Sequence, residues 1–363
     1  MASLSHELKF VHVEIMQEHT TCRDQVSVAM YVTLRMVWCY HARMEQTKKK
    51  AVVVGGAGFI GSHITDALIE KGYEVHVIDN LSGGKRENVN SAATLHVLDI
   101  RNLSDISPVI AKADYVFHLA ALPRVQYSID EPLLTHEVNT TGLLNVLVAA
   151  QKGGVGRVVY SGSSSAYGEQ PVLPQHEDMR EKPVHPYGLQ KYVGEEYARI
   201  FFDIYQLPTA TLRYFNVYGP RMDPDGPYAA VIGKFLKFRQ EGKPLSIVGD
   251  GEQTRDFTHV ADVVRANILA AESPKVGHGE SINIGGGRNI SINRLASLVG
   301  GERVHISARQ EAKNSLADIG KAKKLLGWEP NVRVERGIAD LLEEWGFECI
   351  CKDDVCECAL AEA

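Results

Sequence analysis

The chain has 363 residues, of which 44% are hydrophobic and 23% are charged, and its formal net charge is -6 at pH 7. This composition is typical of a folded globular protein with enough apolar material for a core, and it argues against extensive disorder. The acidic balance gives no general attraction to nucleic acid or to an anionic membrane surface, so we expect neither as a partner. Any anionic ligand would have to be held by local groups, above all by arginines.

We expect residues 1–45 to form a poorly ordered N-terminal extension, because Met44 directly precedes the polar phrase that leads into the first obvious strand. The apolar run from Val26 to Tyr40 covers only fifteen residues and contains Arg35, so it is too short to span a membrane. We find no secretory signal, and we therefore expect a cytoplasmic protein.

All six cysteines lie in the two tails, four of them between Cys349 and Cys358 in the tail 346–363. Their spacing does not resemble a disulfide framework, which favours a reducing compartment. The four clustered cysteines could bind zinc or another soft metal, but their C-x-C steps are atypical of structural zinc, and a frayed tail is the simpler interpretation. We therefore predict no metal site.

From residue 51 the chain alternates apolar strand-like runs with amphipathic stretches, which predicts an α/β fold of the Rossmann type, a doubly wound parallel sheet. After Asn216, frequent Pro and Gly break the chain into short elements, which indicates a smaller mixed α/β lobe against the carboxyl ends of the strands. We place the sheet domain at 46–215 and this lobe at 216–345, the two being interleaved. The expected strands are 51–54, 74–78, 94–98, 115–117, 157–160 and 209–213, and the expected helices include 62–71, 139–152 and 188–206.

Three glycines, Gly55, Gly58 and Gly61, lie between the first strand and the first helix in the spacing G-x-x-G-x-x-G. Such a turn lets a pyrophosphate approach the backbone and the helix N-terminus, and Gly61 would let the helix pack close to the strand. Asp79 ends the second strand, where a carboxylate accepts hydrogen bonds from the adenosine ribose and repels a 2′-phosphate. The pattern predicts NAD as the cofactor. The basic pair at 85–86 leaves NADP open as the cofactor, and a glycine turn that binds no ligand is the second alternative.

Tyr187 and Lys191 lie four residues apart, which places a phenol and an ammonium group on one face of a helix. A tyrosine titrates at about 10 in water, and a nearby positive charge favours the phenolate that could act as a base. This spacing also occurs by chance. Upstream, however, Ser163, Ser164 and Ser165 follow a strand, so their hydroxyls are expected at the same carboxyl edge of the sheet. The two motifs together predict one cleft with acid–base chemistry.

With these motifs the sequence resembles the extended short-chain dehydrogenase/reductases, and among them the NAD-dependent epimerase/dehydratase family with its nucleotide-sugar 4-epimerases. The resemblance runs from residue 51 to about 345 and rests also on motifs at 118–121, 139, 212–220, 255–262, 283–286 and 325–330. It implies that Tyr187 is the acid/base, that Lys191 lowers the pKa of Tyr187 and binds the nicotinamide ribose, and that Ser163 bonds the sugar O4. The NAD contacts that it implies are Gly55, Gly58, Phe59, Ile60, Gly61, Asp79, Asn80, Asp99, Ile100, Leu119, Ala120, Ala121, Asn139, Tyr187 and Lys191.

The resemblance also implies a site for a UDP-sugar, in which Arg255 and Arg309 grip the diphosphate. Relatives that eliminate water carry acidic residues where this chain has Ser164 and Ser165, which favours 4-epimerisation through a transient 4-keto intermediate. The implied substrate ligands are Ser163, Ser164, Ser165, Tyr187, Asn216, Arg255, Arg309 and Ser315.

The sugar is expected to be UDP-GlcNAc or UDP-GalNAc, because the segment 221–232 resembles epimerases of UDP-N-acetylhexosamines and Ser315 replaces a bulky tyrosine of hexose-only relatives. The segment between Arg309 and Ser315 is one residue short of the family pattern, and 122–127 also departs from it. Three alternatives stay open: a UDP-glucose/UDP-galactose epimerase, another nucleotide-sugar dehydratase or reductase, and a non-catalytic NAD-binding regulator. By analogy with the family we expect a homodimer formed through the segments 130–152 and 188–206.

Overall fold

The structure, a computed structural model, describes residues 48–225, 230–307 and 313–347. Every element below belongs to the unit Lys49–Ala363. The predictions for the N-terminal extension, the cysteine tail and Arg309 lie outside the described residues. Of the helices in the described ranges, none is long and apolar enough to cross a membrane.

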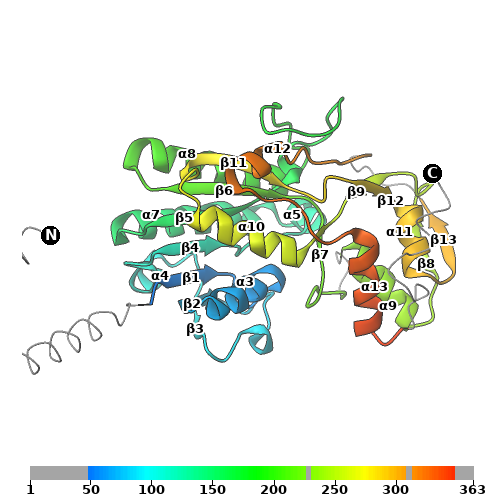
Figure 1. Cartoon of the computed structure of the whole chain (residues 1–363), viewed down its shortest axis with the longest axis horizontal. Helices are drawn as coiled ribbons and strands as arrows, with labels where there is room; N and C mark the ends of the chain where they lie inside the picture. The colour runs from blue at the N-terminus through cyan, green and yellow to red at the C-terminus, as the bar shows by residue number, and fades with distance from the viewer. Residues whose placement is uncertain (1–47, 226–229, 308–312, 348–363) are drawn as a thin grey trace, which may run out of the picture. The chain divides into compact units, whose positions relative to one another are not determined.

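Seven parallel strands form the main sheet in the order β11-β6-β5-β4-β1-β2-β3 (Figure 1). The order reverses between β1 and β4, and at such a switch point the ligands of open α/β sheets bind. The six strands expected from the sequence are confirmed within one to three residues. The strands are β1 (Lys50–Val54), β2 (Glu74–Asp79), β3 (Thr94–Val97), β4 (Tyr115–His118), β5 (Arg157–Ser163), β6 (Thr209–Tyr214) and β11 (His278–Ile284).

Helices cover both faces of this sheet, because alternate residues of its central strands face opposite sides. Val53 and Phe117 pack beneath α3 (Phe59–Glu70), α10 (Val260–Glu272) and α12 (Gly320–Leu326). Val52 and Val116 pack on the other side, beneath α4 (Leu103–Ile110), α7 (Leu143–Gly153) and α8 (Pro186–Tyr205). Each fully buried valine or phenylalanine stabilises the fold by about 1.5–3 kcal/mol, and these two cores hold the strand ends in fixed positions.

The chain between β4 and β5 is more irregular than the sequence predicts. It contains α5 (Val125–Asp130), α6 (Pro132–His136) and a π-helical segment, η2 (Glu137–Gly142), which runs directly into α7. The predicted helix 139–152 therefore begins as a wider π turn. Two short 3₁₀ segments lie elsewhere, η1 (Arg86–Asn88) after β2 and η3 (Ser164–Ala166) directly after β5.

A smaller set of elements surrounds a third core at one end of the sheet (Figure 1), and we call it the lobe. The lobe contains three two-stranded pairs, β10 with β7, β12 with β9 and β13 with β8. Although α10, β11 and α12 come from the same stretch of sequence, they complete the main sheet and its cover. The lobe elements are β7 (Val217–Tyr218), α9 (Val231–Gln240), β8 (Leu245–Val248), β9 (Thr254–Asp256), β10 (Thr258–His259), β12 (Asn289–Ser291), α11 (Ile292–Val299), β13 (Arg303–Ile306) and α13 (Val334–Glu344).

Candidate active site

The glycine loop joins β1 to α3 at the switch point of the sheet. Gly55 has a φ of +85°, and a Cβ there would lie 2.5 Å from the backbone N of Ala120. A Cβ on Gly61 would collide with the backbone O of Gly55, so the start of α3 packs directly against the loop. The N-cap residue of α3 is Gly58, which has no side chain to occupy the N–H groups of the first turn, among them those of Phe59 and Ile60. These residues fit a dinucleotide, because the bare N–H groups and the helix N-terminus both favour a pyrophosphate.

Asp79 lies at the carboxyl end of β2 and is 9% exposed. Its carboxylate accepts hydrogen bonds from the backbone N–H of Ala57 at 2.9 Å and of Leu81 at 2.8 Å. These bonds fix the carboxylate beside the glycine loop, and lone pairs remain on its oxygens for the hydroxyls of a ribose. A carboxylate at this position favours NAD, whose adenosine ribose has both hydroxyls free.

Asn80 directly follows β2, and Asp99 follows the neighbouring strand β3. The Asn80 amide donates to the Asp99 carboxylate at 3.1 Å, and Arg101 donates to both oxygens of that carboxylate at 3.0 and 2.8 Å. The Arg101 hydrogen bonds hold the pKa of Asp99 well below its usual range. Ile100 beside it is buried in the core. Hydrogen bonds therefore link the residues that follow β2 and β3, where the adenosine of the cofactor is predicted to bind.

The segment after β4 passes alongside the glycine loop, since the backbone N–H groups of Leu119 and Ala120 both donate to the backbone O of Val54. Just beyond Ala121, the buried side chain of Asn139 accepts from the Leu122 N–H at 2.7 Å and donates to the Leu122 carbonyl at 3.2 Å. Asn139 also donates to Gln190 of α8 at 2.8 Å. With three hydrogen bonds inside the protein, Asn139 fixes this segment and ties it to the helix of Tyr187.

Tyr187 and Lys191 lie one turn apart on α8, as the sequence predicts. Lys191 is 4% exposed, and its ammonium group donates to the Ser161 carbonyl at 2.8 Å. Burial lowers the pKa of Lys191 to about 7. Burial also raises the pKa of Tyr187 to about 12, and a hydrogen bond with the Ser163 hydroxyl offsets only part of that rise. The phenol is thus protonated at neutral pH in the chain alone, and a further positive charge nearby is needed to make it a base.

The hydroxyl cluster lies where β5 ends. Ser163 caps η3, and its oxygen accepts the N–H of Ser165 at 3.1 Å, which fixes the hydroxyl that bonds Tyr187. Ser164 and Ser165 form the first turn of η3 and are partly exposed. On the neighbouring strand β6, Tyr214 is paired with Ser163, and Asn216 follows two residues later. The structure therefore brings the predicted hydroxyl cluster and Asn216 to adjacent strand ends.

Asn216 has a φ of +27°, and its amide donates to the Asp256 carbonyl at 2.8 Å and to the Ser315 hydroxyl at 3.4 Å. Arg255, on β9, donates to the carbonyls of Thr254 and Lys313, each at 3.0 Å. The predicted substrate ligands Asn216, Arg255 and Ser315 thus lie together on the lobe side of the site.

Asp256 is a residue of this region that the sequence does not single out. It is fully buried and accepts the N–H groups of Gly286 at 2.6 Å, Gly287 at 3.2 Å and Ala317 at 2.9 Å. Burial raises the pKa of Asp256 to about 6, although these three bonds favour the charged form. Asp256 therefore holds the segment of Ser315 against β9 and the turn after β11. Its position next to Arg255 is the only sequence signal for this role.

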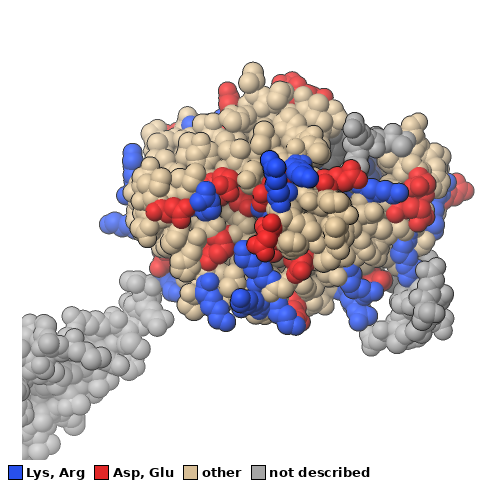
Figure 2. Space-filling view, turned by 90° about the horizontal axis from the view of Figure 1, so that it is seen from above, with Lys and Arg blue, Asp and Glu red and all other residues tan. Residues whose placement is uncertain are grey.

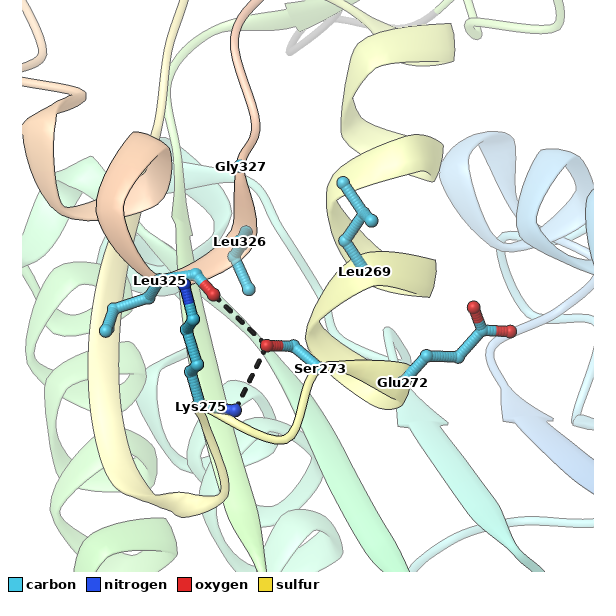
Figure 3. Close-up of a pocket in the computed structure, with 7 residues that line it drawn as sticks. All are labelled: Leu269, Glu272, Ser273, Lys275, Leu325, Leu326 and Gly327. Atoms are coloured by element: carbon cyan, nitrogen blue, oxygen red, sulfur yellow. Dashed lines mark hydrogen bonds between the residues drawn. The ribbon is translucent and has the colours of Figure 1, made fainter.

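A cavity of about 360 Å³ lies away from these residues, between the ends of α10 and α12 (Figure 3). Arg157, the first residue of β5, donates to the carbonyl of Ser273 in its wall at 2.8 Å, so the cavity lies at the amino ends of the strands. Ser273 itself is bonded to the Leu325 carbonyl and the Lys275 N–H. The predicted acid–base and nucleotide-binding residues lie at the opposite edge of the sheet. Across the described ranges, no group of three His, Cys, Asp or Glu residues could hold a metal ion.

The sheet, the glycine loop and the tyrosine–lysine pair define a class, the Rossmann-fold enzymes that use a dinucleotide together with a tyrosine acid/base. Residues 51–285 match the family described as "NAD dependent epimerase/dehydratase family", and the chain belongs to it. Its cofactor is NAD, and within the family its relatives are enzymes of UDP-sugars, largely 4-epimerases.

Among curated proteins, the putative UDP-glucose 4-epimerase of Methanocaldococcus jannaschii is 39% identical over 297 residues, 79% of this chain and 95% of the relative. The solved UDP-glucose 4-epimerase of Thermotoga maritima, with UDP-glucose, has 41% identity and a TM-score of 0.78, covering 82% of this chain and 98% of that one. The UDP-N-acetylglucosamine 4-epimerase of Methanobrevibacter ruminantium has 39% identity, a TM-score of 0.78 and the same coverage. A relative from Bacillus cytotoxicus named UDP-N-acetyl-alpha-D-glucosaminuronate decarboxylase is 34% identical, so the family relationship alone leaves the reaction open.

Proposed function

We propose that the chain inverts the configuration at C4 of a UDP-linked hexose, with UDP-GlcNAc and UDP-GalNAc as its first substrate pair. One observation carries the proposal: the phenol of Tyr187 bonds Ser163 and lies one turn from the buried Lys191, at the edge where the glycine loop ends. A base, a hydrogen-bond donor and a cofactor site then share the carboxyl edge of the sheet.

The roles of the side chains follow from their surroundings. Tyr187 takes the proton from the sugar O4 and later returns it, while the fixed Ser163 hydroxyl holds that oxygen in place. Lys191, buried and bonded to the Ser161 carbonyl, lies one turn from Tyr187, and in its protonated form it would add to the positive charge that lowers the pKa of the phenol. NAD, when bound, supplies the hydride-transfer chemistry at C4. Because the proton returns to O4 and the hydride returns to C4, the sugar keeps its oxidation state and no net oxidation of the substrate results.

Ser164 and Ser165 support epimerisation over loss of water. Elimination from a 4-keto sugar needs an acid and a base near C5 and C6, and hydroxyl groups cannot fill these roles at neutral pH. In η3, directly after Ser163, the chain offers only these two hydroxyls.

The choice of an N-acetylated sugar rests on Ser315. Its small side chain lies against the amide of Asn216, where a larger side chain would occupy the space we assign to the C2 substituent. UDP-glucose and UDP-galactose are the second candidate pair, because relatives at 39% and 41% identity are named as UDP-glucose epimerases.

The test is to incubate the purified chain separately with UDP-GlcNAc, UDP-glucose, UDP-glucuronate and dTDP-glucose, without added NAD, and to identify the products by NMR and mass spectrometry. We expect a 4-epimer of unchanged mass, and UDP-GlcNAc as the best substrate. A product lighter by water or carbon dioxide, or a requirement for stoichiometric NAD, contradicts the proposal.

We also propose that the chain forms a homodimer through the helical region from α6 to α7 and α8. Several apolar side chains on these helices are exposed, among them Leu133 at 82%, Ile204 at 66% and Leu189 at 51%. Light scattering after gel filtration should give twice the monomer mass, and Leu133→Glu with Leu189→Glu should give the monomer mass. A wild-type chain that is monomeric at micromolar concentration contradicts this assignment.

A further inference from the structure

His185 makes two different contacts with the first turn of α8. Its Nδ1 atom accepts the backbone N–H of Gly188 at 3.0 Å, so it is the N-cap of the helix. Its ring also lies parallel to the ring of Tyr187, with 6.2 Å between centroids and 14° between planes. The usual N-cap residues, Ser, Thr, Asp and Asn, make only the first kind of contact.

The backbone of this turn is held on two more sides. Ser128 of α5 is buried, donates to the Val125 carbonyl at 2.6 Å and accepts the Tyr187 N–H at 3.0 Å. On the side of η3, a Cβ on Gly188 would lie 2.7 Å from the Ser165 carbonyl, so helix and hydroxyl cluster are in close approach. These contacts fix the backbone of Tyr187, and the hydrogen bond with Ser163 holds its phenol oxygen, but none of them sets the plane of the ring.

The orientation of the ring matters because one phenol oxygen must reach both Ser163 and the reacting sugar oxygen. The His185 ring, parallel to the phenol within 14°, restrains the plane of the phenol. Burial lowers the pKa of His185, which keeps the imidazole neutral and its Nδ1 an acceptor at neutral pH. Cap and ring contact therefore coexist in one protonation state.

We propose that His185 is a positioning residue for Tyr187: its Nδ1 fixes the start of α8, and its ring fixes the plane of the phenol. The inference rests on the proposed function in that Tyr187 is the acid/base. An aromatic pair of this kind restricts a ring by an amount that corresponds to roughly tenfold in rate when the ring carries the chemistry.

Two substitutions separate the two contacts. His185→Ser keeps a good N-cap and removes the ring, whereas His185→Phe keeps a ring and removes the acceptor. His176→Ser is the matched control, because His176 is an exposed histidine of the same connection between β5 and α8. The readouts are kcat and KM for the best UDP-sugar, amide hydrogen exchange at Gly188, and the ¹³Cζ chemical shift of Tyr187, assigned by its loss in Tyr187→Phe.

For His185→Ser we expect slow exchange at Gly188, a KM within about twofold of wild type, a shifted Tyr187 signal and a kcat roughly tenfold lower. For His185→Phe we expect a kcat within about threefold and exchange at Gly188 at least about fivefold faster, the factor that corresponds to a cap of about 1 kcal/mol. Wild-type kcat and wild-type ¹³Cζ shift in His185→Ser overturn the ring role, and unchanged exchange in His185→Phe overturns the cap role. If the wild-type chain converts no UDP-sugar, the proposed function fails, while exchange and the ¹³Cζ shift still decide both contacts of His185.

Discussion

Lys191→Met should change how the stability of the cofactor-free protein depends on pH. Lys191 is 4% exposed, and burial lowers its pKa to about 7, whereas an unfolded chain keeps it near its usual value of about 10.4. Between these two values the unfolded state binds one proton more than the folded state, so the free energy of unfolding rises with pH. The slope for one proton is about 1.4 kcal/mol per pH unit, and it vanishes above the unfolded pKa and below the folded one. Methionine fills a similar volume and carries no charge, so the variant should lack this slope.

The assay is urea unfolding of NAD-free protein at pH 7, 8 and 9, with wild type, Lys191→Met and the exposed control Lys152→Met. We expect the wild type and the control to gain about 1–3 kcal/mol relative to Lys191→Met across this window. We also expect Lys191→Met to be at least as stable as wild type at pH 7, because it removes a buried charge. Parallel pH profiles for all three proteins would refute the reasoning, since they would show that Lys191 titrates as an exposed lysine does.

Further changes test the site from other sides. Tyr187→Phe should bind NAD normally, measured as cofactor released on denaturation, yet lose at least ~100-fold in turnover; near-normal turnover would remove it as the acid/base. Ser315→Tyr should lower kcat/KM for UDP-GlcNAc at least ~10-fold and leave UDP-glucose nearly unaffected, and an equal loss on both sugars would contradict the assignment of the C2 pocket. Asp256→Asn should cost about 1–3 kcal/mol in urea unfolding, because one amide oxygen cannot accept the N–H groups of both Gly286 and Ala317; unchanged stability would show that the carboxylate is dispensable.

The main sheet and its cofactor edge could be predicted from the sequence because their signals are local. The buried run of β1, the glycine spacing up to Gly61 and the terminal Asp79 each follow from neighbouring residues. Tyr187 and Lys191 share a helix face through their spacing alone. These patterns persist because strand period, helix period and the need for bare backbone at a turn depend on residues a few positions apart.

The strand β11 escaped prediction because polar residues interrupt its apolar run. Glu280 accepts the N–H groups of Gly277 and His278 at the start of the strand, and Asn283 bonds Gln175 and the Tyr167 hydroxyl. The partners of Asn283, more than 100 positions away in the sequence, make this polar residue acceptable in a buried strand. The sequence of β11 therefore does not predict a strand by itself, because its polar residues are satisfied only in the folded protein.

The sequence by itself determined which residues could do chemistry, namely Tyr187, Lys191 and Ser163, and on what kind of fold. Tertiary structure alone decided how they are held. Ser128 lies 59 positions before Tyr187, and nothing in its neighbourhood marks it as the acceptor of the Tyr187 N–H. From the sequence, His185 is expected to be a loop histidine. Only the structure shows that it caps α8 and contacts the ring of Tyr187. Such contacts depend on which elements pack together, and packing is set by the whole core, whereas the motifs are set by spacing along the chain.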